Sequence, residues 1–208
     1  MKKIYFFVLG LLSFVYAQNI ERDTIDLKES IVYNKAKYKL KRFGPDTKSQ
    51  KVLVGLKADL NMKNDSMPKI VKGFAVYINA PKKEYSVEQL NLNFGNKLEN
   101  PIRLKIDLVQ NIKEENRKSL LKEPLFLTIS NENQDEENVF HYNLKELSLK
   151  NKDEFYIYVE LLEELEKPTF FSAALFSKCY YQPEDQNVWH KTPLGISPSI
   201  NVDLLIKK

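Results

Sequence analysis

Aromatic side chains gather around one predicted loop near the C-terminus, and their types suit ligand binding best. Tyr180, Tyr181, Trp189 and His190 flank the polar stretch 182–187. The apolar face of an aromatic ring stacks on sugar C–H groups, while nearby polar groups fix the orientation of the sugar. Carbohydrate binding is therefore one hypothesis. In the alternative, which the pattern favours, Trp189 fills the edge of the core and the tyrosines cover a sheet.

Glutamates could supply acid–base chemistry, because several follow one another closely in the chain. A glycosidase needs two carboxylates about 5–10 Å apart in a cleft, and the candidates here are Glu160, Glu163, Glu164 and Glu166. A charge run at the end of a strand is usually a solvated terminus. The sequence has neither the G-x-S-x-G motif of serine hydrolases nor a phosphate-binding loop. We therefore expect no enzyme and no catalytic residue, with a hydrolase of unrecognised carboxylates as an alternative.

Metal-binding patterns are missing from the sequence. The two histidines, His141 and His190, are far apart and form no H-x-x-x-H or C-x-x-C spacing. Asp135, Glu136 and Glu137 could donate oxygen to calcium, but they lack the D-x-D-x-D-G pattern and fit a solvated acidic loop better. We expect no metal and no cofactor.

The single cysteine, Cys179, cannot form an internal disulfide. It lies in an apolar, strand-like run, so the sequence predicts a buried small hydrophobic residue. A catalytic thiol would need a histidine partner. Stability must then come from a full hydrophobic core.

The N-terminus has the features of a secretory signal peptide. Lys2 and Lys3 precede an apolar run over 4–16, and Val15-Tyr16-Ala17 places small side chains where a signal peptidase cleaves, before Gln18. The run is short for a bilayer-spanning helix, although an uncleaved anchor is the alternative. We expect a signal peptide over 1–17, an extended leader over 18–36 and one domain over 37–208. The mature chain should have no membrane span and should be periplasmic, bound to the outer-membrane surface or secreted.

Charge is nearly balanced along this 208-residue chain. It carries 32 basic and 28 acidic residues, and loss of Lys2 and Lys3 leaves a net charge of about +2. Basic and acidic residues are interspersed, which argues against a nucleic-acid partner. The dense basic patch over 35–42 is typical of an edge strand protected by lysines.

Alternating apolar residues predict strands through most of the chain. Within 102–109, Ile102, Leu104, Ile106 and Leu108 alternate with charged residues, as in a strand with one face on a core. Similar patterns cover 37–43 (ending at a Gly44-Pro45-Asp46 turn), 51–60, 69–80, 89–94, 125–129, 139–149, 155–162, 170–181 and 200–206. Only 111–122 has helical character. The pattern predicts an all-β, two-sheet antiparallel β-sandwich, jelly-roll-like, with little helix.

The order of these landmarks resembles a known family. The matching features are the leader Asp23-Thr24-Ile25-Asp26-Leu27, the basic run into Phe43-Gly44-Pro45, the strands at 90–94 and 102–109, Pro124, His141-Tyr142-Asn143-Leu144, the strand at 155–162, and Tyr180, Tyr181 and Trp189. The chain resembles the exported β-sandwich domains of Gram-negative bacteria that often accompany a carboxypeptidase-regulatory-like module, although it shows no such module. The resemblance implies a jelly-roll sandwich and an envelope or secreted location, and it implies no activity.

We expect a non-catalytic binding or structural module at the cell envelope, whose partner is an unknown envelope protein or glycan. Asp23-Thr24-Ile25 and Asp65-Ser66-Met67 look like the acceptor used for O-glycosylation in some periplasmic systems. Thr24 and Ser66 are therefore possible glycosylation sites, and Ser66 is favoured because it lies in a predicted loop.

Overall fold

The structure is a computed structural model, and it describes residues 37–58, 70–112, 117–163 and 165–208. These residues belong to one compact unit, Asn34–Lys208. The predicted signal peptide, the leader and both possible glycosylation sites, Thr24 and Ser66, lie outside the described residues.

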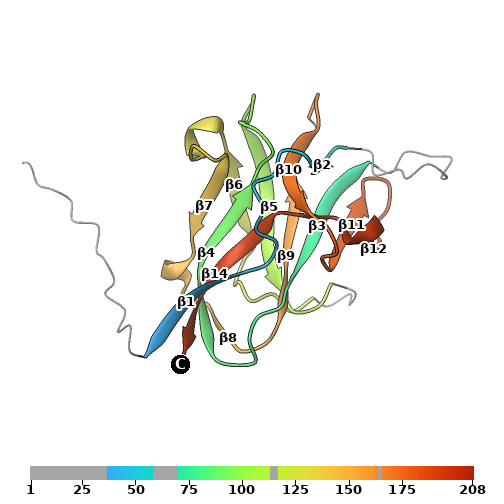
Figure 1. Ribbon diagram of the computed structural model, residues 1–208. Coiled ribbons are helices and arrows are strands. Elements are labelled where there is room, and N and C mark those ends of the chain that lie inside the picture. The colour runs from blue at the N-terminus through green and yellow to red at the C-terminus, as the bar shows by residue number, and fades with distance from the viewer. Residues whose placement is uncertain (1–36, 59–69, 113–116, 164) are drawn as a thin grey trace, which may run out of the picture. The chain divides into compact units, whose positions relative to one another are not determined.

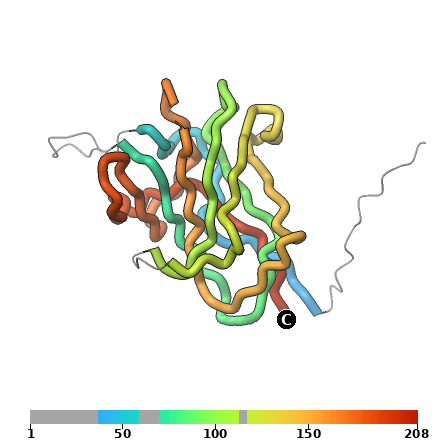
Figure 2. Tube along the Cα trace, turned by 180° about the vertical axis from the view of Figure 1, so that it is seen from behind, coloured from blue at the N-terminus to red at the C-terminus, as the bar shows by residue number. Residues whose placement is uncertain are grey.

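The described chain is built from antiparallel strands in two large sheets and one small sheet (Figures 1 and 2). The five-stranded sheet runs in the order β1 (Tyr38–Phe43), β14 (Ile200–Lys207), β4 (Tyr85–Asn93) and β7 (Val139–Asn143), and β8 (Lys150–Asn151) also pairs with β4. The six-stranded sheet runs in the order β12 (His190–Lys191), β11 (Cys179–Pro183), β3 (Val71–Ile78), β9 (Phe155–Leu161), β5 (Ile102–Val109) and β6 (Leu125–Ile129).

The small sheet consists of β13 (Ser197–Pro198), β10 (Thr169–Ala174) and β2 (Leu53–Leu56). A bridge between Phe94 and Phe171 connects β10 to the end of β4. The helical segments of the described chain are single 3-10 turns: η1 (Asn131–Asn133), η2 (Lys145–Leu147) and η3 (Pro193–Gly195). The predicted fold class, an all-β antiparallel sandwich, is confirmed.

The core fills the space between the inner faces of the two large sheets. Ile102, Leu104, Ile106 and Leu108 of β5 are each at most 2% exposed, as their alternation predicts. Strands of both large sheets supply the other residues of this core. The largest fully buried side chains include Phe74, Phe94, Phe155, Phe171, Leu90 and Leu92. Cys179 is fully buried in this core, and burial raises the pKa of its thiol to about 12.

The prediction of a single strand over 170–181 is wrong. This run forms β10 and β11, which lie in different sheets and are joined by a turn in which Phe176 adopts a left-handed backbone with φ of +61°. Both strands are largely buried on both sides, and the run is apolar except for Ser172, Ser177 and Lys178. Hydrophobicity alone therefore does not reveal the break.

The helical character that the sequence shows over 111–122 does not appear in the part of this stretch that the structure describes, residues 111–112 and 117–122. The chain instead folds back beside the end of β5: the Leu120 N–H donates to the Leu108 carbonyl at 2.7 Å, and Ser119 bridges Val109. Ile112 is buried on one side of the sheet and Leu121 is buried in the main core. Packing against the sheet therefore overrides a weak helical propensity.

Candidate functional site

Five aromatic rings gather on the outer face of the six-stranded sheet. β9 buries Phe155, Ile157 and Val159 in the core, so the alternation of the strand turns Tyr156 and Tyr158 outward. The register then places them beside aromatic residues of other strands, since Tyr77 pairs with Tyr156 and Ala75 pairs with both Tyr158 and Tyr180. We call this surface the outer aromatic face and define it as Tyr77, Tyr156, Tyr158, Tyr180 and Trp189.

The ring contacts form two groups, one of Tyr77, Tyr156 and Tyr180 and one of Tyr158 and Trp189. The centroid distances are 5.3 Å between Tyr77 and Tyr156, 6.0 Å between Tyr156 and Tyr180, and 5.4 Å between Tyr158 and Trp189. The last two pairs meet edge to face, which is a favoured geometry for aromatic rings. Tyr156 and Tyr158 are nearly buried, whereas the other three rings are half-buried and reach solvent.

Three cationic side chains lie over these rings. The Lys178 ammonium is 4.0 Å from the centroid of Tyr77 and 5.3 Å from that of Tyr156. The Arg117 guanidinium lies 5.6 Å from the centroids of both Tyr158 and Trp189, and Lys105 lies 5.8 Å from Tyr158. Cations within about 6 Å of a ring are attracted to its negative face. Positive charge is therefore held at the same places where a flat ligand would stack.

Two glutamates, Glu160 and Glu154, form hydrogen bonds with tyrosines of this face. Glu160 is 2.6 Å from the Lys72 ammonium and 3.6 Å from that of Lys105, and it accepts a hydrogen bond from the Tyr158 hydroxyl. Burial opposes ionisation of Glu160, but the hydrogen bonds from Lys72 and Tyr158 outweigh burial and lower its pKa. Burial raises the pKa of Tyr158, and the bond to Glu160 adds to that shift.

Glu154 plays the corresponding part for Tyr77. The Tyr77 hydroxyl donates a hydrogen bond to the Glu154 carboxylate, and this bond raises the pKa of Tyr77 to about 12. A hydrogen bond with Tyr156 raises the pKa of Lys178 in spite of partial burial. At neutral pH Lys178 is therefore ionised and Tyr77 is neutral.

The structure divides the four aromatic residues that the sequence singles out as ligand-binding candidates. Tyr180 and Trp189 belong to the outer aromatic face. Tyr181 points the other way, is 5% exposed and packs in the main core. His190 lies 5.6 Å from the Tyr181 ring, and its Nε2 is 3.0 Å from the Gln186 Oε1. The Trp189 indole N–H is buried and has no hydrogen-bond partner among the described residues, so packing alone fixes the indole there.

Sequence reasoning does not identify Tyr77, Arg117 or Lys178 as part of this site. The alternation within 69–80 puts Tyr77 on the same side as Ala75, but the register that sets it beside Tyr156 depends on the pairing of β3 with β9. Arg117 comes from the connection between β5 and β6, which the sequence assigns to a helix. Only the tertiary structure unites these residues.

The clustered glutamates do not converge on one place. Glu160 lies on the outer aromatic face, whereas Glu163 and Glu166 line a cavity of about 730 Å³ between the β4–β5 and β9–β10 connections. Glu163 accepts a hydrogen bond from the Arg103 N–H at 2.8 Å. Glu164 lies outside the described residues. The two connections stand side by side at the upper end of the sandwich (Figures 1 and 2).

In the described part of the chain, no group of three or more histidine, cysteine, aspartate or glutamate side chains could hold a metal ion. Asp135 of the acidic loop accepts hydrogen bonds from the N–H groups of Glu137 and Val139, and it lies 3.2 Å from the His141 ring. These bonds outweigh the effect of burial and lower the pKa of Asp135. The carboxylate of Asp135 thus organises its own loop.

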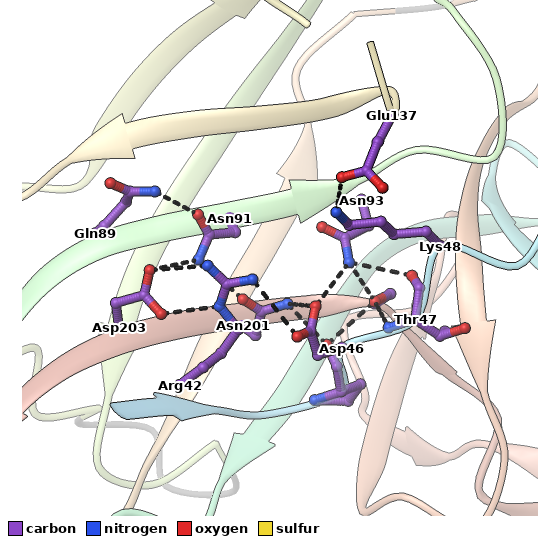
Figure 3. Close-up of polar contacts among 12 residues, drawn as sticks. Arg42, Asp46, Thr47, Lys48, Gln89, Asn91, Asn93, Glu137, Asn201 and Asp203 are labelled. Carbon is purple, nitrogen blue, oxygen red and sulfur yellow. Dashed lines mark hydrogen bonds and ion pairs between the residues drawn. The ribbon is translucent and has the colours of Figure 1, made fainter. Parts of the chain in front are cut away.

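The outer face of the five-stranded sheet carries a polar network instead of aromatic rings (Figure 3). Asn91 of β4 donates to Asn201 of β14 at 2.9 Å, and Asn201 donates to the Pro45 carbonyl at 3.0 Å. Both asparagines are fully buried: residues 45 and 46 lie across Asn201, and Gln89 and His141 lie within hydrogen-bond distance of Asn91. Gly44 permits this path, since a Cβ there would be 2.7 Å from Ile78 and the backbone has a φ of +106°.

The charged end of this network is an ion pair. The Arg42 Nε donates to one Asp203 oxygen at 2.8 Å and a terminal nitrogen donates to the other at 3.0 Å. Burial opposes ionisation of Asp203, but the bonds from Arg42 prevail and lower its pKa. The network satisfies its members internally, so it offers no free group to a ligand.

No described helix is both long and apolar enough to cross a bilayer. Comparisons of the chain with family models, curated proteins and solved structures found no match.

Proposed function

We propose that this protein is an exported, non-catalytic binding module of the cell envelope, and that its outer aromatic face binds carbohydrate. The observation that carries the proposal is the row of half-buried rings Tyr77, Tyr180 and Trp189 on a sheet face that the main core does not use. A sheet gives such rings fixed spacing, and rigid elements make better binding platforms than loops.

The chemistry of the face suits a sugar polymer. Ring faces stack on the apolar faces of pyranose rings, while Lys178, Arg117 and Lys105 surround them with hydrogen-bond donors. Since the cations already lie over the rings, a saccharide with carboxylate or sulfate groups would meet positive charge where it stacks.

Export and envelope location rest on the sequence of residues 1–17, with the basic n-region, the short apolar run and Val15-Tyr16-Ala17. A non-catalytic role is supported by the arrangement of the carboxylates. Glu160 is bound by two lysines, and Glu163 lies with Glu166 at a separate cavity.

A glycan array probed with the purified chain tests the proposal. We expect binding to a set of acidic oligosaccharides, and Trp189→Ala should weaken binding at least tenfold by removing one stacking ring. Tyr38→Ala is the matched control, since Tyr38 is 38% exposed on β1 of the other sheet, and it should bind as the parent does. An array without hits, or equal losses in both variants, would contradict the proposal.

A further inference from the structure

A small apolar projection lies apart from the outer aromatic face. The turn between β10 and β11 carries Leu175 and Phe176, and the neighbouring turn η3 carries Leu194. Their exposed fractions are 45%, 88% and 67%, and Phe176 is the most exposed of the large hydrophobic residues described. We call these three residues the apolar tip. The tip lies beside β11 and β12, at the right of Figure 1.

Backbone hydrogen bonds hold the two turns of the apolar tip together. The Phe176 N–H donates to the Leu194 carbonyl at 3.2 Å, and the Ser177 N–H donates to the Gly195 carbonyl at 2.9 Å. Gly195 allows this close approach, because a Cβ there would lie 2.7 Å from the Ser177 oxygen. The tip is therefore a built feature with a fixed shape.

Phe176 and Leu194 both occupy the left-handed backbone region, with φ of +61° and +50°. Bulky residues rarely adopt this conformation, and such outliers concentrate at sites of binding and switching. Glycine or asparagine would fit these positions with less strain and would expose no apolar surface. Neither residue belongs to a core cluster of the fold, so packing within the chain does not account for them.

The surroundings of the apolar tip carry positive charge. Residues 169–183 and 188–200 contain no aspartate or glutamate, whereas they contain Lys178 and Lys191, both exposed. Lys191 pairs with Tyr180 in β12, and Lys178 lies two residues before Tyr180, so the register sets both lysines beside the base of the tip. One acidic group also interacts with Lys178, namely the carboxylate of Glu154, which directly precedes β9.

We propose that the apolar tip docks this protein on the surface of an anionic phospholipid bilayer. Exposed apolar side chains flanked by lysines gain from inserting among acyl chains while the lysines meet anionic headgroups. A second copy of the chain fits less well as the occupant. With ~200 Å² for an aromatic residue, the three side chains of the tip together offer roughly 400 Å² of surface. A stable protein interface buries about 800 Å² per partner.

Sedimentation of the purified chain with vesicles of phosphatidylglycerol and phosphatidylcholine tests the proposal. We expect binding that weakens as salt rises, because the headgroup attraction is screened. Phe176→Ser with Leu194→Ser should reduce the bound fraction at least tenfold, and Lys191→Glu should reduce it severalfold. Phe126→Ser is the matched control, since Phe126 is 63% exposed on β6 and should be dispensable.

A fluorescence measurement keeps the proposal testable if the double variant fails to fold. In Phe176→Trp, anionic vesicles should shift the emission to shorter wavelength as the indole enters the bilayer, whereas Phe126→Trp should show no shift. Absence of binding by the parent chain, equal loss with Phe126→Ser, or dimerisation that Phe176→Ser abolishes would overturn it. Trp189→Ala should keep vesicle binding, which separates this inference from the proposed carbohydrate site.

Discussion

The outer faces of the two large sheets follow from the same alternation of inward and outward side chains, but they differ in chemistry and in exposure to solvent. On the five-stranded sheet, the outward positions of β4 and β14 include asparagines and an aspartate, and residues 45–47 bond to Asn93 and Asn201. On the six-stranded sheet, the outward positions of β3, β9 and β11 include tyrosines, and cations lie over Tyr77 and Tyr158. One face is closed by its own chain, while the other meets solvent.

The difference lies in how the two faces satisfy their outward side chains. Buried amides must find partners, and Asn201 has three: Asn91, Pro45 and Asp46. Rings satisfied by stacking make no such demand, and they can exchange a covering cation for a ligand. We therefore expect substitutions on the polar face to change stability and those on the aromatic face to change binding.

The largest expected effect is that of Asn201→Ala. This change removes the 2.9 Å acceptor of the Asn91 amide in a fully buried site, which leaves that amide only a 3.4 Å bond to Asp203, and it removes the bond to the Pro45 carbonyl. Unsatisfied buried groups cost ~1–3 kcal/mol each, so we expect the free energy of unfolding to fall by about 3 kcal/mol. Urea denaturation measures it. Tyr180→Ala is the comparison and should cost less than half as much; a reversed order would break the distinction between the faces.

Asp203→Asn should have a smaller, pH-dependent effect. The folded pKa of Asp203 lies below its ordinary value of 3.8, so its stabilising contribution is complete above that pH and is lost as the pH falls through the folded pKa. Since Arg42 is more than a third exposed and water screens the pair, we expect a loss of about 1 kcal/mol at pH 7. Thermal unfolding should show the variant and parent converging below pH 3.8; a constant difference down to pH 2 would contradict this assignment.

Arg117→Ala sharpens the same comparison from the aromatic side. The guanidinium lies over Tyr158 and Trp189 at an exposed position, where a cation–π contact contributes about 0.5–1 kcal/mol. Stability should therefore fall by no more than about that amount, while affinity for an acidic saccharide should fall severalfold. Titration calorimetry on Arg117→Ala and Arg117→Lys separates charge from shape. Unchanged affinity in both would remove Arg117 from the site.

The smallest expected effect concerns the Tyr77 hydroxyl. Its hydrogen bond to Glu154 raises the pKa of Tyr77 to about 12, so Glu154→Gln should bring that pKa down toward 10 with little change in stability. Ultraviolet titration of the tyrosinate absorbance, with Tyr77→Phe to identify the band, measures the shift. A titration curve identical to that of the parent would show that the bond does not form in solution.

Alternation with a period of two predicted the sandwich because a strand that packs on a core buries every second side chain. β5 buries Ile102, Leu104, Ile106 and Leu108 as expected. The break between β10 and β11 was missed because both strands are apolar and only Ser177 and Lys178 interrupt the run at the turn. The alternation within 89–94 separates Asn91 from Leu90 and Leu92, but it could not show that residues 45 and 46 would accept hydrogen bonds from Asn201 of β14. These properties depend on contacts between distant segments.

The candidate site was predicted only in part, for the same reason. Tyr156 and Tyr158 share a face, as their spacing requires, and Tyr180 joins them. Tyr181, which follows Tyr180 in β11, points into the core instead, because adjacent residues of a strand point to opposite sides of the sheet. Arg117 and Lys178 come to the site only through the tertiary structure, which no local sequence pattern specifies.

The most direct test uses the only tryptophan of the chain, whose indole N–H gives a single resonance in a proton–nitrogen NMR spectrum. A saccharide identified on the array would be titrated into the labelled protein. The account predicts that the Trp189 resonance and the amides around Tyr77 and Tyr180 move, while the side-chain amides of Asn91 and Asn201 stay in place. Shifts confined to the asparagines, or to the cavity near Glu163, would contradict it.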